Sequence, residues 1–232
     1  MAIAVHFVED LPRLADDGVA HCFAYGPDDQ RAVHNANLLV AQHLLEVAVL
    51  TDDEAMARCA LRAVQFSLNH QRTDGAFPYG VSLPGQAHEQ GLLQLVDHHH
   101  TGFVLRSLHA INRHADSEVL TRAIRQGYDY YRTLCAEDGM PRDAHRNFPV
   151  DIHACAEAVL CPAALQRVAM GTNRHSTAAM RWAWSEMRDR KTGAPYYRKY
   201  RGFTSKIAYP RWGVAWMYRA LAEYLWAFQK GV

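Results

Sequence analysis

Residues 32–49 read AVHNANLLVAQHLLEVAV, and their apolar side chains recur at i, i+3, i+4 and i+7. This spacing places the apolar groups on one face of an α-helix. Strand-like alternation bounded by hairpin turns is scarce elsewhere in the chain. The pattern predicts an all-α protein, because the helical spacing returns in six more stretches: residues 53–69, 98–113, 117–135, 152–169, 174–188 and 211–229.

Loops that contain glycine separate the predicted helices into pairs. Their sequences include CFAYGPDDQ, QRTDGAFPYG, AEDGMPRD and RKTGAPYY. Asp74-Gly75 and Asp138-Gly139 are turn dipeptides, and Gly193 takes the same place in the fourth loop. A unit of helix, loop and helix thus occurs about four times, which predicts stacked helical hairpins in a single domain over residues 1–232.

The helices that follow these loops begin alike. Their openings align as Asn35-Ala36-Asn37, His100-Thr101-Gly102, His153-Ala154-Cys155 and Trp212-Gly213-Val214, with a small residue at each second position. If the hairpins curve into a double ring, these helices run parallel on the inside and their N-termini meet at one rim. Helix dipoles and free N–H groups there favour anions.

Composition places the chain among ordinary globular proteins. It has 232 residues, 49% of them hydrophobic, and a formal net charge of +1, which excludes a disordered tail, a collagen-like repeat and a polycation. The segment from Arg188 to Arg211 nevertheless carries +7, so the rest of the chain carries −6. Such a basic segment favours an anionic partner, although it is too short to favour nucleic acid.

The beginning of the chain and its cysteines favour a cytoplasmic location. MAIAVHFVEDLPRL lacks the basic start of a secretory signal, and no apolar run is long enough for stable membrane insertion. The five cysteines are odd in number and form no C-x-x-C pair. They are expected to be reduced, buried thiols and not zinc ligands.

Several motifs resemble those of a known fold family. Gln71, Asp74, Gly75 and Phe77 form a Q-x-x-D-G-x-F pattern similar to the repeat motif of α/α-toroid proteins, which include terpenoid cyclases, protein prenyltransferases and six-hairpin glycosidase-like enzymes. Longer stretches resemble α/α-toroid proteins encoded with bacterial exopolysaccharide and capsule biosynthesis genes. These stretches are VHNANLL (33–39), HTGFVL (100–105), PVDIHA (149–154) and RWGVAW (211–216).

The resemblance implies an α/α toroid over about residues 20–225, with two departures. About four hairpins are fewer than a closed toroid has, so the ring is expected to be incomplete, with a second copy or a partner chain covering its open ends. The sequence also lacks the clustered aspartates of terpene cyclases and the Asp-x-Cys motif of zinc-dependent prenyltransferases. Those two activities are therefore disfavoured.

Asp97, His98, His99 and His100 form the densest titratable group in a chain with 14 histidines. Successive helical residues point about 100° apart, so three adjacent histidines cannot all face one metal ion. We therefore predict no metal site and no cofactor. Asp97 is expected to cap a helix and His100 to face the cavity, with His98 and His99 outside the site.

Asp151 and His153 repeat this arrangement one hairpin later. His100 and His153 would line the same rim, where two imidazoles could act as general acid and base. The alternative is that both rings only hydrogen-bond to neighbouring loops.

Polar and aromatic residues near the helix starts are candidate substrate-binding groups. Asn35 and Asn37 indicate a helix cap or ligand contacts, because asparagine is unfavourable inside a helix, where its side chain competes for backbone hydrogen bonds. Arg211 could pair with a carboxylate. Aromatic residues in or beside the loops suit sugar stacking or packing over the core, and they include Tyr25, Tyr79, Tyr197 and Trp212. Trp216 and Trp226 follow helical spacing and are expected in the core.

These residues favour a carbohydrate-active protein of polysaccharide biosynthesis or modification, acting on an anionic, uronate-type oligosaccharide or polysaccharide. A hydrolase would use Asp97 and Asp151 as its two carboxylates. A lyase or epimerase would instead use a base, with Arg211 and Asn35 holding the substrate carboxylate; the candidate bases are His100, His153 and Tyr197. One alternative is a non-catalytic glycan-binding or scaffold module of an exopolysaccharide assembly complex. A weaker one is an isoprenoid-binding toroid, which the polar helix starts disfavour.

Overall fold

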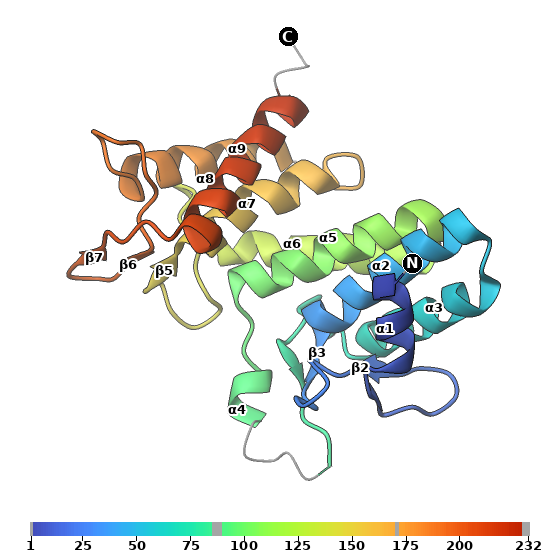
Figure 1. The fold of residues 1–232 in the computed structure, drawn as a ribbon. Helices are drawn as coiled ribbons and strands as arrows, with labels where there is room; N and C mark the ends of the chain where they lie inside the picture. The colour runs from blue at the N-terminus through green and yellow to red at the C-terminus, as the bar shows by residue number, and fades with distance from the viewer. Residues whose placement is uncertain (1, 85–89, 170–171, 229–232) are drawn as a thin grey trace. The chain divides into compact units, whose positions relative to one another are not determined.

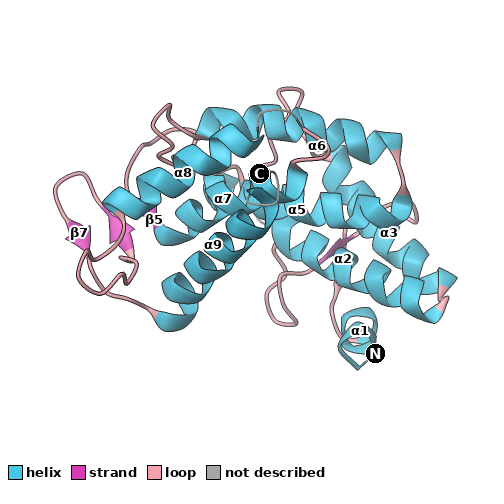
Figure 2. Cartoon of the chain, turned by 90° about the horizontal axis from the view of Figure 1, so that it is seen from above, coloured by secondary structure: helices cyan, strands magenta, loops and turns pink. Residues whose placement is uncertain are grey.

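The computed structural model describes residues 2–84, 90–169 and 172–228. Helices dominate this part of the chain, and its strands are only two residues long (Figure 2). The prediction of an all-α chain of helical hairpins is confirmed. The predicted helices agree with the observed ones to within a few residues at most ends, although Ala32 and Val33 form a short strand in place of a first helical turn.

The chain packs as two compact units. The first comprises residues 1–96 and 104–127, and two helices, α5 (His98–Ala115) and α6 (Glu118–Tyr131), contribute to both units. The other elements of the first unit are α1 (Ala2–Glu9), β1 (Arg13–Leu14), β2 (Cys22–Phe23), β3 (Ala32–Val33), α2 (His34–Thr51), α3 (Glu54–Asn69), β4 (Gly80–Val81) and α4 (Gln90–Leu93).

The hairpin of α2 and α3 forms the centre of the first unit (Figure 1). Its turn is short because Asp52 adopts a left-handed conformation (φ 54°) and Asp53 caps α3, its side chain accepting a 2.9 Å hydrogen bond from the Met56 N–H. The pair of β3 with β4 places Val33 opposite Gly80 and so fixes where α2 begins.

The second unit comprises residues 97–103 and 128–232. Besides the start of α5 and the end of α6, its elements are η2 (Arg132–Leu134), β5 (Val150–Asp151), α7 (Ile152–Leu165), α8 (Thr172–Glu186), β6 (Arg198–Lys199), β7 (Thr204–Ser205), the π-helical turn η3 (Pro210–Val214) and α9 (Ala215–Phe228). The three strands form one antiparallel sheet in the order β5-β6-β7.

Helix α7 is the core of the second unit. Thirteen of its fourteen residues are buried, since α8 and α9 both pack against it (Figure 1). Val159 and Leu160 lie in one apolar cluster with Met180 of α8 and Ala220 of α9. A helix with apolar residues on every side is expected in such a central position, and α7 departs from this only at His153 and Glu157.

The tryptophans of these helices only partly occupy the core positions that their helical spacing predicts. Trp216 packs on the α7 cluster, as expected, and Trp182 is also buried. Trp226 is 63% exposed, so its placement in the core was wrong. It lies on a face of α9 other than the one that Ala220 and Tyr224 turn toward α7.

Two glycine turns pack directly on helices, which explains why the repeat retains them. Gly75 (φ 90°) and Gly139 (φ 95°) have conformations that a side chain disfavours. A Cβ at Gly75 would lie 2.3 Å from the Gln126 carbonyl oxygen, and one at Gly139 would lie 2.3 Å from the Ala178 carbonyl carbon and oxygen. In the fourth loop Gly193 (φ 76°) is also left-handed, but it faces open space in the described structure.

None of the helices in the described residues is both long enough and apolar enough to cross a bilayer.

Candidate functional site

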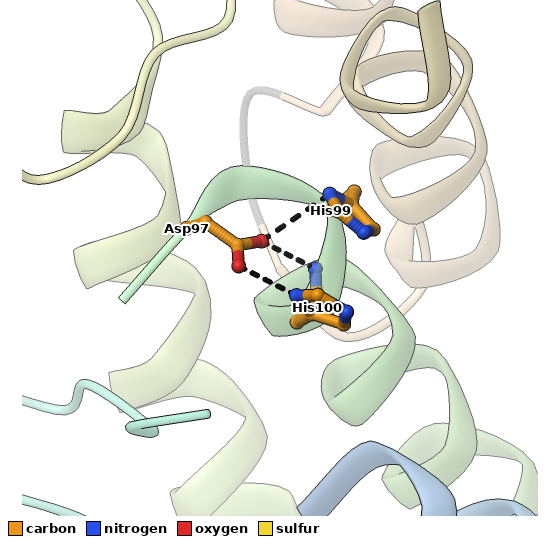
Figure 3. Close-up of side chains that lie close together, drawn as sticks. All are labelled: Asp97, His99 and His100. Atoms are coloured by element: carbon orange, nitrogen blue, oxygen red, sulfur yellow. Dashed lines mark hydrogen bonds and ion pairs between the residues drawn. The ribbon is translucent and has the colours of Figure 1, made fainter. Parts of the chain in front are cut away.

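The site forms where α5, α7 and η3 begin in the second unit. Asp97 precedes α5 and caps it, because its Oδ1 accepts a 2.8 Å hydrogen bond from the His100 N–H. Its Oδ2 lies 2.5 Å from His100 Nδ1, and its Oδ1 lies 3.4 Å from His99 Nδ1 (Figure 3). The predicted cap is therefore confirmed, and the carboxylate also holds two imidazoles.

His99 lies between the two histidines that the sequence singles out. Its ring centroid is 3.9 Å from that of His100 and 5.9 Å from that of His153. His99 was expected to stand outside the site, yet its ring lies beside those of His100 and His153. The Asp97 carboxylate draws His99 and His100 together in the first helical turn (Figure 3). His98 does point elsewhere: it is buried, and its Nδ1 lies 3.1 Å from the Tyr131 hydroxyl.

Asp151 caps α7 much as Asp97 caps α5. Its Oδ1 accepts a 2.9 Å hydrogen bond from the His153 N–H. Its Oδ2 accepts bonds of 3.0 and 2.7 Å from Nε and Nη2 of Arg198. The ion pair follows from strand register, since β5 and β6 place Asp151 opposite Arg198. This carboxylate is thus committed to a cap and to a guanidinium.

His153 connects the imidazoles to the aromatic residues of η3 and α9. Its ring lies 4.5 Å from that of Trp212 with the planes tilted by 30°, and it meets Trp216 edge-on at 5.6 Å. The side chain is only 8% exposed, and its Nε2 has no hydrogen-bond partner within the described chain. A buried, unpaired nitrogen costs free energy. His34 and His98 each carry one too, but only His153 of these three contacts the exposed Trp212.

Burial favours the neutral form of His99 and His153, whereas the surroundings of Asp97 favour its charged form. Burial lowers the pKa of His99 to about 4, with the nearby Asp97 charge opposing the shift. Burial also lowers the pKa of His153, against the Asp151 charge and a hydrogen bond to the Trp212 backbone. Burial raises the pKa of Asp97, but the His100 hydrogen bond and the His99 and His100 charges outweigh it and hold that pKa well below the usual range.

Two cavities adjoin this row of rings. One of about 200 Å³ has Asp97, His99 and Asp151 in its wall together with three arginines, Arg142, Arg146 and Arg198. The other, of about 380 Å³, is lined by Tyr197, Tyr209, Pro210, Arg211 and Trp212. Trp212 is 49% exposed, so its ring offers a surface to the second cavity while it packs against His153.

The sequence-predicted residues fall into two groups. The second unit holds Asp97, His100, Asp151, His153, Tyr197, Arg211 and Trp212, whereas Tyr25, Asn35, Asn37 and Tyr79 belong to the first unit. Within the second unit, contacts between the rings join His100, His153 and Trp212 through His99. Tyr197 meets Tyr209 edge-on at 5.0 Å beside Arg211.

Asn37 is a core residue, which corrects its assignment as a ligand-binding group. It is fully buried in α2. Its Oδ1 accepts a 2.9 Å bond from the Phe23 N–H, and its Nδ2 donates to Ala63 O and to Ser67 Oγ. These bonds use the amide for internal packing and leave it out of contact with solvent.

The other first-unit candidates lie closer to the surface. Asn35 is half-buried, and its Oδ1 has no hydrogen-bond partner among the described residues. Tyr25 is exposed, with the Arg31 guanidinium 5.0 Å above its ring. Tyr79 is half-buried beside β4, where its carbonyl accepts a bond from the His34 N–H.

Sequence reasoning missed His99 and Tyr209. A usable signal for His99 was its position two residues after a capping aspartate, since side chains in a first helical turn can converge on the cap. Tyr209 directly precedes Pro210, and no periodicity marks it as a site residue.

No family model matches the sequence, and no curated protein matches it. Solved structures do resemble it. A GH76 α-mannanase from Bacteroides thetaiotaomicron has a TM-score of 0.73 at 11% identity, covering 98% of this chain and 63% of that one. Cellobiose 2-epimerase from Bacillus thermoamylovorans has a TM-score of 0.69 at 14% identity, and the match covers 88% of this chain and 60% of the epimerase. An unsaturated glucuronyl hydrolase specific for heparin has a TM-score of 0.67 at 12% identity, and the match covers 96% of this chain and 65% of the hydrolase.

These likenesses show that the chain has the α/α-toroid glycosidase-like fold expected from its motifs. At these identities they show the fold alone. The chain spans less than two thirds of the length of each of these structures.

Proposed function

We propose that the protein is a carbohydrate-active enzyme that moves a proton on a uronate-type glycan, as an epimerase or a lyase. The observation that carries the proposal is His153, a buried imidazole with an unpaired Nε2, packed against an exposed tryptophan beside an arginine-bearing cavity. The solved structures of similar fold include an epimerase, glucuronyl hydrolases and a polysaccharide lyase by name.

The aromatic cavity has the composition that an anionic sugar requires. Trp212, Tyr197 and Tyr209 present ring surfaces and hydroxyl groups, and ligand pockets commonly combine such surfaces with few charged groups. The Arg211 guanidinium could hold a uronate carboxylate with two parallel hydrogen bonds. A uronate seated there would lie against the Trp212 ring, whose indole packs against His153.

Proton abstraction fits the site better than glycoside hydrolysis by Asp97 and Asp151. A hydrolase needs one carboxylic acid that keeps its proton near neutral pH. The pKa of Asp97 is lowered instead, and Asp151 pairs with Arg198. A neutral His153 can accept the C5 proton of a uronate that comes within hydrogen-bond reach of its Nε2. The adjacent carboxylate then holds the electrons of the broken C–H bond as an enediolate. Return of a proton to the opposite face gives the epimer, whereas loss of the C4 oxygen substituent gives the lyase product.

Turnover of uronate polymers in D₂O tests this proposal. The wild-type protein should either introduce deuterium at C5 or release an unsaturated uronate, read by mass spectrometry and ultraviolet absorbance. His153→Ala should lower the rate by about 10²- to 10⁴-fold, the usual contribution of a general acid–base group. Exopolysaccharide and capsule polymers are the first substrates to try, because of the motif resemblance.

His145→Ala is the matched control, because His145 is an exposed histidine of the same unit. Circular dichroism should show that both variants fold. Unchanged turnover in folded His153→Ala would refute the assignment of His153. Polymer binding without any bond change in the wild type would favour a glycan-binding module instead.

A further inference from the structure

We propose that Asp97, His99 and His100 bind a divalent metal ion such as Zn²⁺. One ligand atom from each of the three side chains lies within 4.8 Å of the other two. They supply two imidazole nitrogens and one carboxylate oxygen, a donor set that proteins use for such ions with positions left open. This proposal does not depend on the proposed reaction.

The arrangement exceeds what capping of α5 requires. A cap needs one contact, the bond from the His100 N–H to Asp97 Oδ1. Here both imidazoles also turn toward the same carboxylate, with Nδ1–Oδ separations of 3.4 and 2.5 Å. Ligand atoms around a tetrahedral zinc ion lie about 3.3 Å apart, so a cation needs only a small opening of the His100 contact.

The surroundings leave room for a coordinated water or substrate oxygen. The side chains of Asp97, His99 and His100 are 19%, 26% and 28% exposed, so the cluster is neither sealed nor free in solvent. Asp97 and His99 also form part of the wall of the 200 Å³ cavity. A three-ligand site open to a cavity is the arrangement found in catalytic rather than structural zinc sites.

A second observation independent of the helix start is the neighbouring His153. Its ring meets His99 edge to face at 5.9 Å, and its buried Nε2 has no partner within the described residues. An unpartnered polar atom thus lies on the ring that packs against one of the proposed ligands. Hydrogen-bonding groups of this kind commonly orient what a bound metal holds.

His98 supports the cluster from the inside. It is buried, and its Nδ1 lies 3.1 Å from the Tyr131 hydroxyl, which anchors the first residue of α5. The neighbouring ligands therefore start from a fixed backbone. Such anchoring lowers the conformational entropy that binding must overcome.

Metal titration of the whole chain tests the proposal without substrate. Protein stripped with a chelator is titrated with Zn²⁺ by calorimetry, and its metal content is measured after desalting. We expect one tightly bound ion per chain, a rise in Tm with Zn²⁺, visible absorption bands with Co²⁺ as the probe, and no comparable binding of Mg²⁺.

Variants assign the site. His99→Ala and His100→Ala should each weaken Zn²⁺ binding at least tenfold, whereas His114→Ala, at an exposed position in the last turn of the same helix, should not. Asp97→Asn keeps a good capping residue and removes the charge, so it tests the ligand role in a variant expected to fold. Retention of full affinity in these three variants, or no stoichiometric binding by the wild type, would overturn the proposal.

The metal and the reaction can fail separately. Zn²⁺ binding without turnover of uronate polymers would support the metal site and refute the proposed function. Turnover that requires His153, in a protein that binds no Zn²⁺, would support the proposed function and refute the metal site.

Discussion

His34 is fully buried at the start of α2, where it makes the first unit sensitive to acid. Burial lowers its pKa to about 3, and the facing His70, 5.8 Å away ring to ring, lowers it further when charged. The unfolded chain binds a proton near the ordinary pKa of about 6.5. Protonation therefore favours unfolding, so this stability is complete above pH 6.5 and is lost as the pH falls toward 3.

The prediction concerns His34→Gln, which removes this titration. Between pH 7.5 and 5.5, the wild-type free energy of unfolding should fall by about 1 kcal/mol more than that of the variant. Urea denaturation at both pH values measures the difference. His114→Gln, at an exposed position, should behave like the wild type. Equal acid sensitivity in His34→Gln and wild type would contradict the assignment.

At the scale of elements, the glycine turns carry the clearest prediction. Gly139→Ala combines a left-handed backbone with a Cβ placed 2.3 Å from the Ala178 backbone, so it should cost about 3 kcal/mol of stability. Gly193→Ala shares the backbone conformation but meets open space in the described structure, and it should cost only about 1 kcal/mol. Denaturant midpoints at unchanged m-values compare the two. Similar losses would show that packing of the turn on α8 contributes little.

Helical periodicity predicted the long helices well and the short elements poorly. The spacing of apolar residues in 152–169 indicates a helix because one buried face suffices to define it, and α7 is indeed present. Strands β5 and β6 are two residues long, which is too short for any periodic signal. Yet this pair determines that Arg198 neutralises Asp151, a contact between residues 47 positions apart.

At the scale of the whole molecule, charge is unevenly distributed along the sequence. The segment from Arg188 to Arg211 carries +7 against −6 elsewhere. The structure pairs two of its members, Arg198 with Asp151 and Lys199 with Glu186, while Arg211 lines the aromatic cavity. The prediction of a single domain stays a prediction, as do the cytoplasmic location and the partner chain.

Salt should weaken the binding of an anionic glycan by this segment. Calorimetry at rising ionic strength should show a falling affinity for a uronate oligosaccharide, because the Debye length shrinks from about 30 Å at 0.01 M to about 3 Å at 1 M. A neutral, carboxyl-reduced oligosaccharide should show little change. Arg211→Gln should make the affinity for the uronate oligosaccharide less dependent on salt. Affinity for the uronate oligosaccharide that is independent of salt would contradict an electrostatic contribution.

The sequence by itself determined the helices, their hairpin repeat and the two capping aspartates. These features depend on local chemistry: apolar spacing, turn glycines and a carboxylate just before a helix. Only the tertiary structure decided that His99 meets His153 and that Asn37 belongs to the core, because both outcomes depend on which groups meet across the fold. The same holds for Arg198 and for the unpaired nitrogen of His153, since strand register and helix packing bring distant residues together and no local pattern encodes their contacts.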